Sequence, residues 1–294
     1  MKQFKFIIVT CLVAPIGFLP LSWSQALGAR LGKLLLRFNH KRRHIAQCNI
    51  DACFPALSDH DKKILLQKNA EETGKWFLET PYVWFRKPNY IRKQLTITNG
   101  HILQEAYVKG RGVILILPHL GNWEVLNFYV PFHYPTAAMY QSIKSPALEE
   151  MVFRSRSRTG ITLFSANQHG VRKALKHLKQ GKILVVLSDH LPSKKAGVYA
   201  PFFDIPAWTG KLTHSLVNYN QSTVVLGRTL RKTDDQGFEV GFTVVSGMDT
   251  DDPVQALTAM NQAIEAEIRK TPEQYQWVYR RFARPPEGGR NIYR

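Results

Sequence analysis

Unbroken apolar runs alternate with helical stripes along most of the chain, and this pattern predicts an α/β fold. Two runs, Val113–Leu117 and Ile183–Leu187, are bounded by turn residues, which is typical of strands buried on both faces of a sheet. Further strands are expected at residues 95–97, 133–140, 222–230 and 238–245, and helices at 62–85, 147–159, 171–180, 206–219 and 254–270. We therefore predict a mixed, largely buried central sheet flanked by helices.

The N-terminal residues form a separate apolar stretch. Residues 6–29 carry no charge and are numerous enough to span a bilayer. Pro15, Gly17 and Pro20 make a shallow or broken insertion equally compatible with the sequence. A buried helix of a soluble domain is the alternative.

The residues that follow argue against a cleaved signal peptide. Apolar residues continue to Phe38 and then meet a basic cluster of Lys41, Arg42 and Arg43, which would rest against anionic headgroups. We expect residues 1–40 to be an uncleaved membrane anchor and residues 41–294 to form a single α/β domain.

The charge balance favours an acidic partner. The chain has 40 Lys and Arg against 22 Asp and Glu, a formal net charge of +18. Nucleic acid, anionic lipid, a phosphorylated substrate or an acidic carrier protein would each suit this charge. No recognised nucleic-acid-binding motif is present, so nucleic acid is not expected. The three cysteines are not spaced against His as zinc ligands are, so neither a disulfide framework nor a metal site is predicted.

The end of the first buried run carries the candidate chemistry. Pro118 ends the strand because it has no N–H to donate. His119 therefore lies just past a strand end, where open α/β sheets place their ligands. A helix is expected to begin at Trp123, after a tight turn at Gly121 and Asn122.

His119 and Glu124 are five residues apart across that turn, and we expect them to be close enough to hydrogen-bond. A neutral imidazole accepts a proton near pH 7, and a carboxylate on its other nitrogen fixes the tautomer. The pair therefore suits a general base. The spacing alone is weak evidence, since Glu124 could merely favour a helix N-terminus.

Two other places carry polar residues near predicted strand ends. Arg154, Arg156 and Arg158 lie on one predicted helix, where at most two can face one site; they suit a phosphate or oxyanion clamp or, alternatively, form a solvated face. Asp189 follows the second buried run and could position a substrate or a catalytic group, or simply cap a turn. The aromatic-rich helix at 62–85 is either core or a wall for a lipid chain.

Five stretches together resemble one known family: CNIDACFP (48–55), GRGVILILPHLGNWEV (110–125), RSRSRTG (154–160), GVRKALKHLKQGKILVVLSDH (170–190) and GVYAPFFDIPAWTG (197–210). In order and spacing they resemble the lipid A biosynthesis acyltransferases, the late, Kdo-dependent lauroyl- and myristoyl-type enzymes. These belong to the glycerolipid acyltransferase superfamily with its His-x4-Asp/Glu motif. The resemblance covers nearly the whole chain.

The resemblance implies transfer of a fatty acyl chain from acyl-acyl carrier protein to a hydroxyl of a Kdo–lipid A precursor in lipopolysaccharide biosynthesis. It implies that His119 is the base and that Glu124 orients it. For this reaction we expect neither a cofactor nor a metal. The implied location is the bacterial inner membrane, among anionic lipids, with the catalytic domain facing the cytoplasm.

The remaining site residues expected on this basis fall into two groups. Those expected to bind the substrate or an oxyanion are Arg156, Arg158, Asp189, Asn122 and Lys144. Those expected to line an acyl channel are Trp123 and two exposed aromatics of a loop-rich segment, Phe202 and Phe203.

Two departures from the family pattern leave alternatives open. Residues 140–144 read Tyr-Gln-Ser-Ile-Lys in place of Tyr-Arg-Pro-x-Lys, and Ser188, Asp189 and His190 replace the commoner Pro-Asp-Gln. The same chemistry on another glycolipid or aminolipid acceptor therefore remains possible. A thioesterase or lipid hydrolase is the other alternative, because the same base could activate water.

Overall fold

A seven-stranded sheet forms the centre of the computed structural model, which describes residues 2–143, 145–232 and 237–294, with residues 2–5 and 8 described by their backbone only. The strand order is β1-β9-β8-β2-β5-β3-β4. All neighbours are parallel except β8 and β9. The bounds are β1 (Leu95–Thr98), β2 (Val113–Leu117), β3 (Thr136–Tyr140), β4 (Thr162–Ser165), β5 (Ile183–Leu187), β8 (Thr223–Arg231) and β9 (Phe238–Val244). The predicted mixed α/β fold is confirmed.

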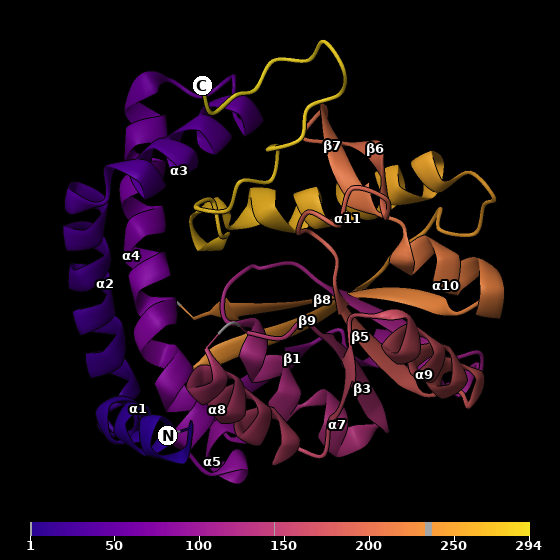
Figure 1. The fold of residues 1–294 in the computed structure, drawn as a ribbon, viewed down its shortest axis with the longest axis horizontal. Helices are drawn as coiled ribbons and strands as arrows, with labels where there is room; N and C mark the ends of the chain where they lie inside the picture. The colour runs from indigo at the N-terminus through magenta and orange to yellow at the C-terminus, as the bar shows by residue number, and fades with distance from the viewer. Residues whose placement is uncertain (1, 144, 233–236) are drawn as a thin grey trace.

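Helices cover the sheet and extend beyond one end of it (Figure 1). Their bounds are α1 (Lys2–Gly17), α2 (Leu21–Phe38), α3 (His40–Cys53), α4 (Asp59–Phe85), α5 (Pro88–Arg92), α6 (Gly100–Val108), η1 (Trp123–Phe128), α7 (Val130–His133), α8 (Pro146–Ser157), α9 (Gln168–Lys179), α10 (Leu212–Asn220), α11 (Pro253–Lys270) and η2 (Pro272–Gln274).

The central strand β2 separates two hydrophobic cores. All five of its residues are buried, and successive side chains point to opposite faces of the sheet. Ile114 and Ile116 belong to the core that includes α9, α10 and α11, whereas Val113 and Leu115 pack with residues of α4, α5 and α6. Burial on both faces explains why this strand has no polar alternation.

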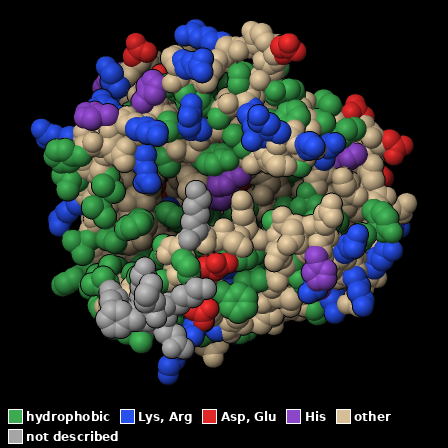
Figure 2. All heavy atoms as spheres, in the orientation of Figure 1, with side chains coloured by type: hydrophobic (Ala, Val, Ile, Leu, Met, Phe, Trp, Pro, Cys, Tyr) green, Lys and Arg blue, Asp and Glu red, His purple; other side chains and the backbone are tan. Residues whose placement is uncertain are grey.

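The N-terminal helix α2 packs closely along α4, at the left of Figure 1. Small residues at the crossing permit this approach: a Cβ on Gly32 would lie 1.9 Å from the carbonyl oxygen of Ala70. On its outer side α2 exposes large apolar side chains, among them Trp23, Leu34 and Phe38. Hydrophobic side chains accordingly gather along α2 at the left of Figure 2.

These helices meet the requirements for a membrane span only in combination. None of the described helices is alone long and apolar enough to cross a membrane. By length and composition, Val9–Gly17 and Leu21–Phe38 meet that requirement together, as a pair bent by 115°.

The structure corrects the expectations for residues 194–219. The segment expected to be a loop contains an antiparallel hairpin of β6 (Gly197–Phe202) and β7 (Ile205–Gly210), and the helix expected from residue 206 begins only at Leu212. Phe203 and Asp204 form the hairpin turn with φ of 52° and 60°. Alternating Pro and aromatic residues obscured the strand period in this segment.

Candidate active site

Two strand ends bring the first pair of polar side chains together. β2 and β5 are parallel neighbours in register, with Leu117 opposite Leu187. His119 and Asp189 each follow their strand by two residues, so they emerge at the same edge of the sheet. The loop after His119 lies against β8, which requires glycine: Gly121 has φ of 60°, and a Cβ there would lie 1.8 Å from the carbonyl oxygen of Thr229.

Asp189 holds His119 through two hydrogen bonds. Nδ1 of His119 lies 2.7 Å from Oδ1 of Asp189, and the His119 backbone N–H donates to Oδ2 at 2.8 Å. Burial alone would raise the pKa of the Asp189 carboxyl, but the charge of His119 and these hydrogen bonds outweigh burial and hold the pKa well below its usual range. An ionised carboxylate only accepts, so in the neutral form of the imidazole it is Nδ1 that carries the proton and Nε2 that keeps a lone pair.

Aromatic rings fix the orientation of the His119 imidazole. His190 stacks on it with ring centroids 3.6 Å apart and planes 3° from parallel, and Trp123 meets it edge-on at 4.6 Å. Tyr279 stacks on the far side of His190 at 3.8 Å. Burial and the nearby His119 lower the pKa of His190 to about 4, so His190 is neutral at pH 7.

Glu124 has different partners from those expected. Its carboxylate accepts hydrogen bonds from Arg156, including one from Nε at 3.1 Å, and from Nδ2 of Asn127 at 3.2 Å. In the described part of the chain, no hydrogen bond joins Glu124 to His119; the carboxylate on His119 is that of Asp189. The reason is local: residues 123–128 form a 3-10 helix rather than an α-helix, and Arg156 of α8 binds the carboxylate.

The other residues expected at the site are dispersed. Arg158 donates to the carbonyl oxygen of Val83 at 2.6 Å, and Arg154 pairs with Glu150 in an exposed position. Asn122 is fully buried and donates to Glu79 at 3.3 Å. Lys144 lies outside the described residues.

The aromatic residues expected along an acyl channel separate into two places. Trp123 is beside His119 and stacks on Trp76 of α4, with centroids 5.0 Å apart. Phe202 and Phe203 are not exposed, which corrects the sequence expectation: they are 1% and 4% exposed and pack in the core against residues such as Trp277. Their place at the end of a hairpin turned toward α11 explains their burial.

An apolar pocket that the sequence did not predict adjoins this stack. It has a volume of about 520 Å³ and lies between α2, α3, α4 and the C-terminal segment. His190, Gln276 and Tyr279 form part of its wall, together with apolar residues that include Leu35, Leu36, Ala46, Ala70, Trp76, Phe77 and Val278. Figure 2 shows a hollow in one face with a His side chain in its depth and Lys and Arg side chains along its rim.

A buried polar network, also missed from the sequence, supports the loop after His119. The Glu79 carboxylate of α4 is fully buried and accepts from Arg231 Nε at 2.7 Å, from Gln25 of α2 at 2.7 Å and from Asn122. It therefore links the N-terminal helices, β8 and the His119 loop. The one available signal was a Glu amid apolar residues on a helix, which spacing alone does not pair with a distant Arg.

Only one group of side chains in the described residues has the composition of a small metal centre. The nitrogen and oxygen donors of His119, Asp189 and His190 lie within 4.8 Å of one another. Nevertheless, the two imidazole planes are parallel and 3.6 Å apart, so their in-plane lone pairs do not converge on one point. Nδ1 of His119 is also occupied by Asp189. The geometry suits an oriented base better than a metal site.

Comparison with known proteins identifies relatives over nearly the whole chain. Residues 1–284 match the sequence profile of a family described as bacterial lipid A biosynthesis acyltransferase. The chain is 28% identical to the lipid A biosynthesis palmitoleoyltransferase of Escherichia coli K12 over 91% of this chain and 87% of that protein. It is 26% identical to the lauroyltransferase of the same organism over 92% and 88%, and 22% identical to its myristoyltransferase over 90% and 83%.

Proposed function

Because the chain belongs to the family of bacterial lipid A biosynthesis acyltransferases, we propose that it moves a fatty acyl group from acyl-acyl carrier protein to a hydroxyl of a Kdo–lipid A precursor. Family membership makes it an acyltransferase of lipopolysaccharide biosynthesis, with an acyl donor and a lipid A precursor as acceptor. The finer proposal rests above all on the His119–Asp189 pair beside an apolar pocket.

In the proposed reaction His119 acts as general base. Its Nε2 takes the proton of the acceptor hydroxyl while the hydroxyl oxygen attacks the thioester carbonyl carbon. The tetrahedral intermediate then breaks its carbon–sulfur bond, and the imidazolium returns the proton to the departing thiolate. Asp189 stabilises the imidazolium and keeps Nε2 directed at the acceptor. The step needs neither a cofactor nor a metal.

Glu124 and Arg156 have a supporting role in this proposal. Arg156 lies over the ring of Tyr140, the last residue of β3, and is held there by Glu124, with its side chain 20% exposed. A guanidinium held in this way can contact a substrate phosphate or the oxyanion of the intermediate, where a positioned charge lowers the barrier most. Glu124 then serves the reaction through Arg156.

The surroundings suit a lipid substrate. The apolar pocket beside His190 would receive an acyl chain, and the basic surface suits both the acidic carrier protein and a phosphorylated acceptor. We propose that residues 1–40 anchor the chain at the bacterial inner membrane through the exposed apolar side of α2, with residues 41–294 on the cytoplasmic side. The basic start of α3 agrees with this orientation.

The test is to incubate the membrane-bound protein with acyl carrier proteins of several acyl lengths and a Kdo–lipid A precursor, with and without a chelator. We expect the acceptor to gain the mass of an acyl chain at equal rates in both conditions. Release of free fatty acid without acceptor gain would support a hydrolase. If the donor were consumed only when a different lipid replaced the Kdo–lipid A precursor, the result would support another acceptor. Loss of turnover on chelation would contradict a metal-free mechanism.

A further inference from the structure

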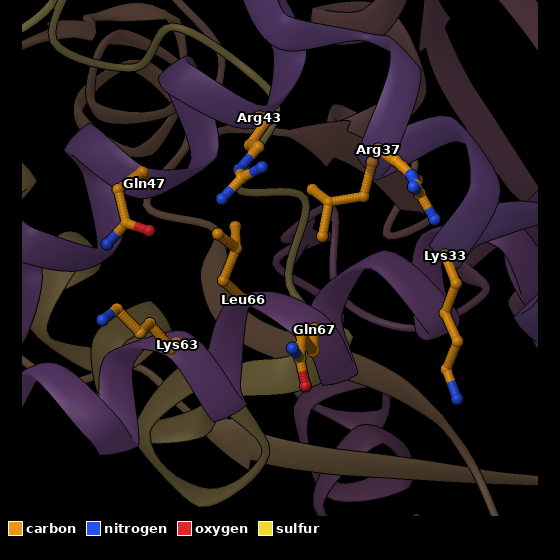
Figure 3. Close-up of a pocket in the computed structure, with 8 residues that line it drawn as sticks. Lys33, Arg37, Arg43, Gln47, Lys63, Leu66 and Gln67 are labelled. Atoms are coloured by element: carbon orange, nitrogen blue, oxygen red, sulfur yellow. The ribbon is translucent and has the colours of Figure 1, made fainter.

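A second pocket, of about 490 Å³, is lined by residues of helices α2, α3 and α4 (Figure 3). Figure 3 shows Arg43 and Gln47 extending from α3 toward Leu66, with Lys63 and Gln67 on α4 opposite them. Its lining consists of four cations, two amides and two leucines: Lys33, Arg37, Arg43, Lys63, Gln47, Gln67, Leu36 and Leu66. Among the described residues, no acidic side chain lines it.

Most of the positive charge at this pocket is uncompensated. Lys33 pairs with Glu71 at 2.9 Å. Across the residues that the structure describes, Arg37, Arg43 and Lys63 take part in no ion pair. Three cations around one concave surface, two of them guanidinium groups with planar donor sets, are suited to a phosphate group.

The surface next to the pocket is suited to lipid chains. On α2 the cations alternate with large exposed apolar residues: Leu34, Leu35 and Phe38 are 54%, 46% and 68% exposed. Long basic side chains beside an apolar helix face lie at the level of the headgroups when that face enters a membrane. Leu36 and Arg43 also line the apolar pocket beside His190, so the two pockets are neighbours.

We propose that this pocket binds the phosphate group of an anionic membrane lipid. The headgroup lies among Arg37, Arg43 and Lys63, and the lipid chains lie against the exposed apolar residues of α2. A concave site with apolar neighbours fits a lipid headgroup better than it fits the acidic surface of a carrier protein. The proposal does not depend on the proposed reaction, because none of its cations is assigned a part in proton transfer.

The experiment measures binding of the full-length protein to phosphatidylcholine vesicles with and without phosphatidic acid. The quantity compared is the ratio of the two affinities, which removes the contribution of apolar insertion. We expect R37Q/K63Q to lower this ratio by about 20-fold, since each cation near an anionic surface contributes several-fold to binding. The matched control R172Q/K173Q removes the same two charges from α9 and is expected to leave the ratio unchanged.

Both pairs of residues are exposed, so both variants are expected to fold, and an unchanged thermal midpoint checks this. The single variant K63Q is expected to lower this affinity ratio by about fivefold, less than the double variant does. An unchanged ratio in R37Q/K63Q would overturn the proposal. An equal loss in the α9 control would also overturn it, because it would indicate diffuse charge attraction.

Two further arms identify the ligand. Inorganic phosphate, compared with chloride at the same ionic strength, is expected to leave most of the vesicle preference intact; complete loss would indicate a free-phosphate site instead. Purified acyl carrier protein is expected to bind R37Q/K63Q as it binds wild type. Loss of carrier binding with an intact vesicle ratio would show a protein-docking surface and overturn the lipid assignment.

Discussion

At the scale of single residues, Glu124 and Arg156 are expected to act as one unit, because each is largely buried and hydrogen-bonded to the other. We predict that E124Q and R156Q each lower kcat by about 10²-fold, as removal of one positioned charge at a reacting centre typically does. The double variant is expected to lose no more than the more impaired single variant. Steady-state kinetics of wild type, the two single variants and the double variant measures these losses in kcat. If the fold losses in kcat of the two single variants multiplied in the double variant, Glu124 would act independently of Arg156.

His190 is expected to make stability depend on pH. Its pKa is lowered to about 4 in the folded protein, against about 6.5 in an unfolded chain. As pH falls from about 6.5 to about 4, the unfolded chain binds a proton that the folded protein does not, so the free energy of unfolding decreases, by about 3 kcal/mol at most. Above pH 6.5 this contribution to stability is fully present.

Denaturant unfolding at several pH values between 7 and 4 tests this dependence. H190Q, which keeps a polar side chain but cannot take up a proton there, is expected to show a flatter decline than wild type. The same slope in both proteins would assign the decline to other groups.

The sequence located His119 and Asp189 correctly just past two strand ends, but it did not pair them. Neighbouring positions in sequence made Glu124 the apparent partner of His119. The actual hydrogen bond depends on β2 and β5 lying side by side, which joins residues 70 positions apart. The rings of Trp123 and His190 that hold the imidazole likewise come from different loops.

At the scale of elements, the buried Glu79 joins α2, α4, β8 and the His119 loop. Its carboxylate forms an ion pair with the buried guanidinium of Arg231. We predict that E79Q lowers the free energy of unfolding by about 3 kcal/mol, because it removes the fully buried partner of Arg231 and leaves this guanidinium with Glu72 as its remaining carboxylate. Denaturant unfolding in detergent measures the change.

The matched control for E79Q is E71Q, on the same helix. Glu71 pairs with the exposed Lys33, so its loss is expected to cost at most about 1 kcal/mol. Equal effects of the two substitutions would mean that burial does not set the strength of the Glu79 network.

Prediction of strands and helices succeeded where the apolar pattern of the segment fitted only one kind of element. β2 and β5 were predicted with their observed bounds because a continuous apolar run of five residues between turn residues is too short for a buried helix and fits a buried strand. The prediction for residues 197–210 was wrong because Pro201 and Pro206 suggested a loop. They are instead opposite each other in a two-stranded hairpin whose edges tolerate proline.

At the scale of the whole molecule, the site lies where the end of the sheet meets the layer formed by α2, α3 and α4 (Figure 1). The apolar pocket, the cationic pocket and the exposed apolar side of α2 all belong to this layer. The apolar N-terminal residues and the excess of positive charge could be read directly from the sequence. The pockets were beyond prediction, because their walls combine helices that are adjacent only after folding.

The most direct measurement of the central claim is the rate of acyl transfer to the lipid A precursor, read as product mass, in wild type, H119A and D189N. We predict that both substitutions lower kcat by about 10²- to 10⁴-fold, because one removes the proposed base and the other the carboxylate that holds its imidazole. H190Q, the neighbouring substitution, is expected to retain activity within about tenfold of wild type, because it touches the base only by stacking. Undiminished acyl transfer by H119A would contradict the account.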